Sequence, residues 1–158
     1  QTLDQLQSFQ VAEFQGSYAV GMLRLLMDSV ASHLGDLSPS FTHKDLHDEQ
    51  VIQRSNQDLT ILDFENWQPD DPLIDLSYYL FHAFRLDYPT EHIQALFEGY
   101  FSQLADDNTR SILSFYTLFI AARAVKFFAE RNRKYLPLTL INFAKVTAAL
   151  RREQPWKL

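Results

Sequence analysis

Along the first 36 residues, apolar side chains recur every three or four positions, which is the spacing of one face of an α-helix. These apolar residues are Leu3, Leu6, Phe9, Phe14, Met22, Leu23, Leu25, Leu26, Val30 and Leu34. Gly16 and Gly21 interrupt the pattern, and Gly35 followed by Pro39 ends it. The sequence therefore predicts one or two helices within residues 1–36.

Between residues 50 and 64 the pattern changes to two short apolar runs, residues 50–54 and 59–64, separated by a polar turn. The runs contain β-branched and aliphatic residues, and the turn reads Ser-Asn-Gln-Asp. Two such runs around a short polar turn are typical of a β-hairpin. We therefore expect a hairpin here, preceded by an irregular lead-in.

Beyond residue 72 the helical spacing returns and predicts four helices. They cover about residues 73–86, 91–104, 109–131 and 138–152. Asp71 before Pro72, Thr90, and the polar run at residues 106–108 are the predicted helix caps. The first of these helices is apolar nearly all round, which indicates a buried position. The polar, Pro-containing residues 65–72 are predicted to be a loop.

Together the patterns predict a mainly α fold with a small β-hairpin, in the α+β class. We expect a single domain over residues 1–158, with a helical part at 1–36, a loop and hairpin at 41–64, and a helical subdomain at 72–152. Apolar residues make up 46% and charged residues 22% of the chain, a composition typical of a globular protein.

Composition argues against several classes of partner and location. The net charge is −6 and no dense basic run occurs, which argues against nucleic acid. The absence of cysteine excludes a disulfide framework and favours a cytoplasmic location. No apolar stretch is expected to reach the roughly 18 residues of a membrane span, so no membrane association is predicted.

The hairpin would bring Asp45 and Gln50, at its entrance, close to Asp63 at its exit. Phosphoryl transfer requires a carboxylate to accept the proton of a substrate hydroxyl, and an Asp and an amide side chain to hold Mg²⁺ against the nucleotide phosphates. These three residues are of the required types. A second interpretation concerns His43 and His47, which on a helix would have the spacing of two zinc ligands, although no third ligand is evident.

Three segments resemble the catalytic region of the aminoglycoside phosphotransferase and choline kinase superfamily, the small-molecule relatives of protein kinases. They are HKDLHDEQ at residues 43–50, LDFE at 62–65 and DPLIDL at 71–76. The usual family patterns are His-Gly-Asp-Leu-His-x-x-Asn, Ile-Asp-Phe/Trp-Glu and Asp-Pro-x-x-Asp-Leu. The three segments occur in this order and lie close together in the sequence.

The resemblance implies an ATP-dependent and Mg²⁺-dependent phosphotransferase. In it, Asp45 would be the catalytic base and Asp63 the principal Mg²⁺ ligand. Gln50 would be the second ligand, and with Asp63 it would hold the metal and the nucleotide. The acceptor would be a small hydroxyl-bearing molecule.

The resemblance also implies supporting residues and shows two departures. His43, His47 and Asp75 would support the catalytic loop. Lys44 stands where the family has Gly, which crowds the loop unless the lysine side chain points to solvent. Gln50 replaces an Asn and is longer by one methylene group.

The same resemblance identifies the chain as the helical C-terminal lobe of a protein-kinase-like fold. Kinases cover the nucleotide with a Gly-rich strand–turn–strand and a lysine. The four glycines, Gly16, Gly21, Gly35 and Gly99, form no such arrangement. We therefore expect the nucleotide-covering N-terminal lobe to be absent and to be a missing partner, and we expect the isolated chain to bind ATP weakly and turn over little.

The substrate and two alternative functions stay open at this point. Glu65, Asp70, Asp71 and Glu98 would suit a cationic substrate if they lay near the site. A catalytically inactive kinase-like scaffold or regulatory module is the main alternative, and the two departures from the family pattern favour it. A plain helical interaction domain is the other, and it predicts no hairpin between residues 50 and 64.

Overall fold

The computed structural model describes residues 28, 30, 31, 39–55, 58–101 and 106–151. Within these ranges the chain forms mainly helices and two small antiparallel sheets, which confirms the predicted α+β class. The elements are β1 (Ser40–Thr42), η2 (Asp48–Gln50), β2 (Val51–Ser55), β3 (Asp58–Ile61), η3 (Phe64–Asn66), β4 (Gln68–Asp70), α3 (Leu73–Arg85), α4 (Thr90–Tyr100), α5 (Asp107–Arg131), η4 (Arg133–Tyr135) and α6 (Leu136–Arg151). The helices predicted within residues 1–36 lie outside the described residues, apart from three positions. Of these, Val30 is fully buried in the core.

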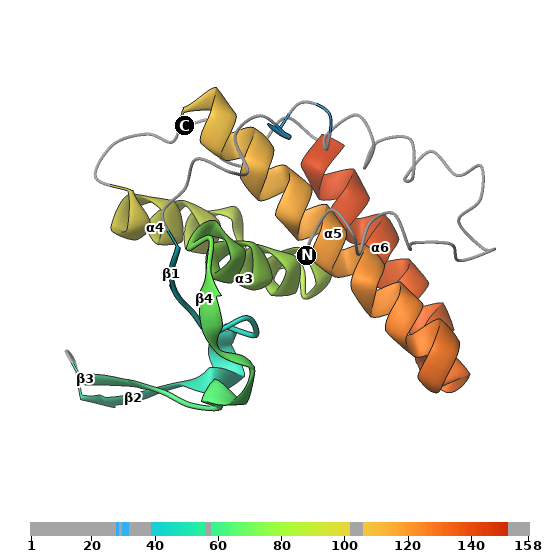
Figure 1. Cartoon of the computed structure of the whole chain (residues 1–158), viewed down its shortest axis with the longest axis horizontal. Coiled ribbons are helices and arrows are strands. Elements are labelled where there is room, and N and C mark those ends of the chain that lie inside the picture. The colour runs from blue at the N-terminus through green and yellow to red at the C-terminus, as the bar shows by residue number, and fades with distance from the viewer. Residues whose placement is uncertain (1–27, 29, 32–38, 56–57, 102–105, 152–158) are drawn as a thin grey trace.

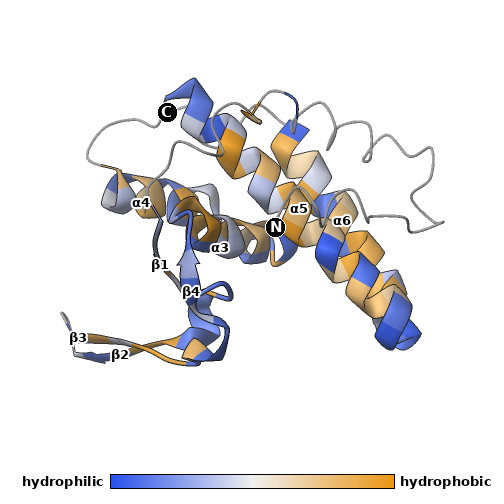
Figure 2. Cartoon of the chain, in the orientation of Figure 1, coloured by the Kyte–Doolittle hydropathy of each residue, from blue (hydrophilic) through white to orange (hydrophobic). Residues whose placement is uncertain are grey.

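The hydrophobic core lies where α3, α5 and α6 pack against one another (Figure 1). Figure 2 shows apolar residues gathered in the middle of this helical body, with hydrophilic residues at the ends of α5. The fully buried apolar side chains come from all three helices and from Val30. The largest of them are Val30, Leu80, Ile112, Leu113, Phe115, Leu118, Val125 and Val146. The buried position predicted for α3 is confirmed.

Helix α5 corrects one expectation from the sequence. It has 25 residues, and its most apolar 18-residue window has a mean hydropathy of 1.6, so by length and composition it is able to cross a membrane. The expectation that no stretch reaches this length was therefore wrong. However, 67% of that window is buried inside the fold. Because α5 contacts both α3 and α6, its apolar character is that of a core helix.

The starts of the four helices agree with the sequence patterns to within two residues. The predicted end of the second helix at residue 104 was wrong, because α4 ends at Tyr100 and Phe101 is extended. Of the three predicted caps, the one within residues 106–108 forms. The Asp106 carboxylate accepts a hydrogen bond of 2.7 Å from the Thr109 amide at the start of α5. At α3 the cap position is Pro72 and not the predicted Asp71, although the Asp71 carboxylate accepts a hydrogen bond of 2.9 Å from the Leu73 amide. The prediction for Thr90 was wrong, because Thr90 is the first residue of α4 and Pro89 occupies the cap position without a side-chain hydrogen bond.

The predicted hairpin is formed by β2 and β3, in the register Val51↔Ile61 and Gln53↔Leu59. This contradicts the plain helical alternative, which required no hairpin. The prediction that residues 65–72 form only a loop was wrong, because η3 and β4 lie there. Strand β4 pairs with β1 in the register Ser40↔Asp70 and Thr42↔Gln68. This pairing joins residues about thirty positions apart, which local sequence patterns do not reveal.

Candidate functional site

The segment at residues 43–47, which the sequence predicts to belong to the catalytic loop, connects β1 to η2 and is attached to the start of α3. The Asp75 carboxylate, in the first turn of α3, accepts hydrogen bonds of 2.8 Å from the backbone amides of both His43 and Lys44. A carboxylate that receives two backbone N–H groups holds that backbone strongly. Asp75 therefore fixes the path of the loop, which is a structural role.

The His43 side chain connects the loop to the end of the hairpin by a hydrogen bond. This side chain is buried, with 2% of the residue exposed, and its Nε2 lies 2.6 Å from the carbonyl oxygen of Leu62. Since a carbonyl oxygen only accepts, Nε2 carries the proton. The imidazole also packs against the Phe64 ring in a T-shaped arrangement, with centroids 5.0 Å apart. His43 thus links the start of the loop to the residues that flank Asp63.

The interpretation of His43 and His47 as a zinc pair was wrong. Residues 43–47 form no helix, so the four-residue spacing does not place the two imidazoles on one face. The Nε2 of His43 is already engaged in a hydrogen bond with the carbonyl oxygen of Leu62. His47 instead faces α3.

Lys44 has a left-handed backbone, with φ of 64°, which favours glycine. This conformation gives a physical reason for glycine at this point in the family pattern. The lysine side chain does not point to solvent: its ammonium group forms an ion pair of 2.5 Å with the Asp70 carboxylate on β4, and only 17% of the side chain is exposed. The ion pair offsets part of the cost of the strained backbone.

We expect Lys44→Gly to be more stable than Lys44→Ala by about 0.5 to 1 kcal/mol. Both variants lose the ion pair with Asp70, but only alanine keeps the Cβ that disfavours positive φ. The free energy of unfolding of the two variants in urea measures this difference. Equal stabilities would contradict a left-handed backbone at Lys44.

The structure brings Gln50 and Asp63 together at the base of the hairpin. The Gln50 amide Nε2 donates a hydrogen bond of 3.1 Å to Oδ2 of Asp63. Asp63 has φ of 61°, which turns the chain sharply after β3 and presents its carboxylate to Gln50. The two side chains that the sequence predicted as metal ligands are therefore neighbours.

Asp45 is half-buried and lies near Asp63 on one side of the loop and near His43 and His47 within it. Burial raises the pKa of its carboxyl, the charge of Asp63 raises it further, and His47 and His43 oppose the rise. The burial contribution is the largest of these. A carboxylate with a raised pKa is a better proton acceptor than an ordinary surface Asp.

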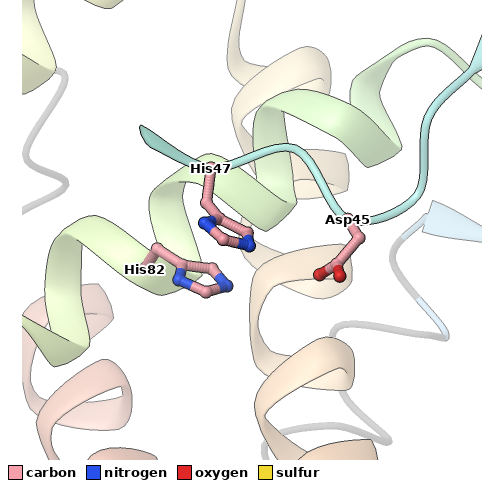
Figure 3. A group of neighbouring side chains, drawn as sticks. All are labelled: Asp45, His47 and His82. Atoms are coloured by element: carbon pink, nitrogen blue, oxygen red, sulfur yellow. The ribbon is translucent and has the colours of Figure 1, made fainter. Parts of the chain in front are cut away.

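His82 on α3 is a site residue that the sequence analysis missed. Its ring stacks on that of His47, with centroids 4.4 Å apart and an interplanar angle of 12°. One ligand atom from each of Asp45, His47 and His82 lies within 4.8 Å of the others (Figure 3). Burial lowers the pKa of His82 to about 3, and the Arg85 charge contributes, so the imidazole is neutral at pH 7. In the sequence, His82 looked only like part of an apolar helix.

A cavity of about 1000 Å³ opens beside Asp45, between the loop, β4, α3 and α5. Among the described residues its wall carries acidic and basic side chains in equal number. The acids are Asp45, Glu65, Asp70 and Glu130, and the bases are Lys44, Arg123, Lys126 and Arg131. A hydroxyl-bearing molecule bound in this cavity would have Asp45 in its wall.

The predicted acidic character of this region does not hold for the cavity. Asp70 is neutralised by Lys44. Asp71 is buried, and its carboxylate accepts a hydrogen bond of 2.8 Å from the Tyr116 hydroxyl. Glu98 is not in the cavity wall. The charges of the described wall therefore give no preference for a cationic substrate.

Comparison with known proteins gives one match. The sequence profile described as the phosphotransferase enzyme family matches residues 3–113, which is more than half of the chain. The matched range contains the loop, the hairpin, α3 and α4. Searches among curated proteins and among solved structures found no match.

Proposed function

The chain belongs to the phosphotransferase enzyme family, and from this premise we propose that it transfers the γ-phosphoryl group of ATP to a hydroxyl group of a small molecule. The observation that carries the proposal is the hydrogen bond between Gln50 and Asp63, at the base of the hairpin. Two side chains suited to holding Mg²⁺ are neighbours there, and Asp63 is close enough to Asp45 to raise its pKa.

Asp45 is the proposed catalytic base. Its carboxylate lines the cavity, so a substrate hydroxyl bound there is able to donate a hydrogen bond to it. Accepting the hydroxyl proton makes the oxygen a better nucleophile toward the phosphorus atom. Asp75, in the first turn of α3, keeps the loop in place by accepting hydrogen bonds from the backbone amides of His43 and Lys44. His43 adds a hydrogen bond from its imidazole to the carbonyl oxygen of Leu62, just after β3.

Gln50 and Asp63 fit Mg²⁺ as ligands. Mg²⁺ prefers oxygen atoms and is usually held by one or two carboxylates together with substrate phosphates. Asp63 supplies a carboxylate, and Gln50 supplies an amide oxygen once its side-chain amide rotates by half a turn. When bound, Mg²⁺ neutralises negative charge on the phosphate groups.

We also propose that a nucleotide-covering lobe completes the site. The described residues contain no Gly-rich strand–turn–strand that would cover the phosphates. Next to Asp63 they expose an aromatic surface, formed by Phe41, Phe64 and Trp67. Phe41 stacks on Trp67 with centroids 5.2 Å apart, and more than 40% of each residue is accessible. Such a surface is typical of a place where another part of the protein packs.

The test is Mg²⁺-dependent nucleotide binding by the complete gene product, followed with a fluorescent ATP analogue. We expect binding to be tighter with Mg²⁺ than with a chelator, and Asp63→Asn to weaken the Mg²⁺-dependent part by at least about tenfold. Asp58→Asn, at the exposed tip of the same hairpin, is the matched control and should bind as the wild type does. Absence of any Mg²⁺-dependent binding would overturn the proposal in favour of the inactive scaffold.

A further inference from the structure

We infer that Asp45, His47 and His82 form a binding site for Zn²⁺, separate from the Gln50–Asp63 pair. The three side chains offer one carboxylate oxygen and two imidazole nitrogens, all within 4.8 Å of one another. In Figure 3 the two rings lie one above the other, and each turns a nitrogen toward the Asp45 carboxylate. The site lies beyond the phosphotransfer function proposed above.

The donor set selects a transition metal over Mg²⁺. Zn²⁺ accepts imidazole nitrogen and carboxylate oxygen together, at about 2.0 to 2.2 Å, whereas Mg²⁺ prefers oxygen ligands. Ligand atoms of a tetrahedral Zn²⁺ site lie about 3.3 Å apart. The three donors therefore need to converge by at most about 1.5 Å from the observed 4.8 Å limit. Small side-chain rotations supply a movement of this size.

The three donors come from two parts of the fold, helix α3 and the loop at residues 43–47. His82 projects from α3 between Phe81 and Ala83, both of which are buried. Asp45 and His47 belong to the loop that Asp75 attaches to α3. Within the described part of the chain, the side chains of these three residues form no hydrogen bond with any other group. The nearest charged contact is that of His47 Nδ1 with Glu49 Oε2, at 4.0 Å, which is too long for a hydrogen bond. The donors are therefore free to bind a metal.

The site also has an entry path and an open position. Asp45 and His82 both line the cavity of about 1000 Å³, so an ion is able to reach them from solvent. Three protein ligands leave the fourth position of a tetrahedral Zn²⁺ for water. One consequence rests on the proposed function: Zn²⁺ on the Asp45 carboxylate would stop it from accepting the substrate proton, so Zn²⁺ would inhibit phosphotransfer.

The test is the Zn²⁺ affinity of the metal-free protein, measured by competition with a chromophoric chelator in the absence of nucleotide. We expect one Zn²⁺ per chain, and we expect His82→Ala to weaken binding by at least about tenfold. His92→Ala removes an exposed histidine from α4 and is the matched control, with unchanged affinity. His47→Ala, in the loop, should weaken Zn²⁺ binding to a similar extent. This variant tests the site if His82→Ala does not fold.

Bound Co²⁺ provides a second readout, because its visible absorption reports coordination by these ligands. The absorption should appear with the wild type and with His92→Ala, and should be lost with His82→Ala. No binding of either metal by the wild type, or equal Zn²⁺ affinity in wild type and both site variants, would overturn the proposal. Since neither readout involves nucleotide, failure here leaves the phosphotransfer proposal standing, and failure of phosphotransfer leaves this one standing.

Discussion

Asp45→Asn in the complete gene product is expected to lower the rate constant for phosphotransfer by about 10²- to 10⁴-fold, the range for loss of a general base. Asparagine has nearly the shape of aspartate but cannot accept the hydroxyl proton. Asp45 makes no hydrogen bond to the described residues, so the substitution should leave the loop in place. Single-turnover kinetics with a panel of small hydroxyl compounds measures the effect.

The matched control is Asp58→Asn, which makes the same chemical change at the exposed tip of the hairpin and should leave the rate unchanged. A rate for Asp45→Asn within a few-fold of the wild type would exclude Asp45 as the base. Mg²⁺-dependent nucleotide binding that persists in Asp45→Asn would show that the loss lies in the chemical step.

The same substitution should also change how the free energy of unfolding depends on pH. Burial raises the pKa of Asp45 in the folded protein above the ordinary value of 3.8. The folded state therefore holds this proton more tightly than the unfolded state, and the wild type loses stability as the pH rises from 3.8 through the raised pKa. The Asp45→Asn variant does not lose stability in this way, because asparagine does not titrate. Its free energy of unfolding, relative to the wild type, should increase across that window and stay constant at higher pH, as urea unfolding at several pH values would show.

Phe115→Ala is expected to lower the free energy of unfolding by about 3 to 5 kcal/mol, the range for deletion of a buried aromatic ring. Phe115 is fully buried at the centre of α5, and its ring stacks on that of Phe119 with centroids 6.1 Å apart. Its removal leaves a cavity where α5 meets its neighbouring helices. Chemical denaturation followed by circular dichroism measures the loss.

Phe127→Ala is the control on the same helix. Phe127 is 49% exposed, and the Arg131 guanidinium lies 5.2 Å from its ring centroid. Its substitution should cost about 1 kcal/mol or less. Similar losses for the two variants would contradict the placement of α5 at the centre of the core.

The sequence determined the elements whose causes are local. Helical spacing of apolar residues placed α3, α5 and α6 within a few positions of their observed bounds, and the carboxylates of Asp71 and Asp106 gave the starts of α3 and α5. The apolar runs around a polar turn gave the hairpin. The order of motifs pointed to Asp45, Gln50 and Asp63, and it did so because all three belong to one continuous segment of chain.

Tertiary structure decided the relations between distant segments. Three such relations join residues more than twenty positions apart. They are the pairing of β1 with β4, the hydrogen bond from the His43 amide to Asp75, and the ion pair between Lys44 and Asp70. His82 meets His47 only because α3 packs beneath the loop. Such contacts depend on how elements pack, which spacing along one segment does not encode. The chain's own pattern therefore identified the candidate residues for phosphoryl transfer, and only the packed fold revealed the candidate zinc site beside them.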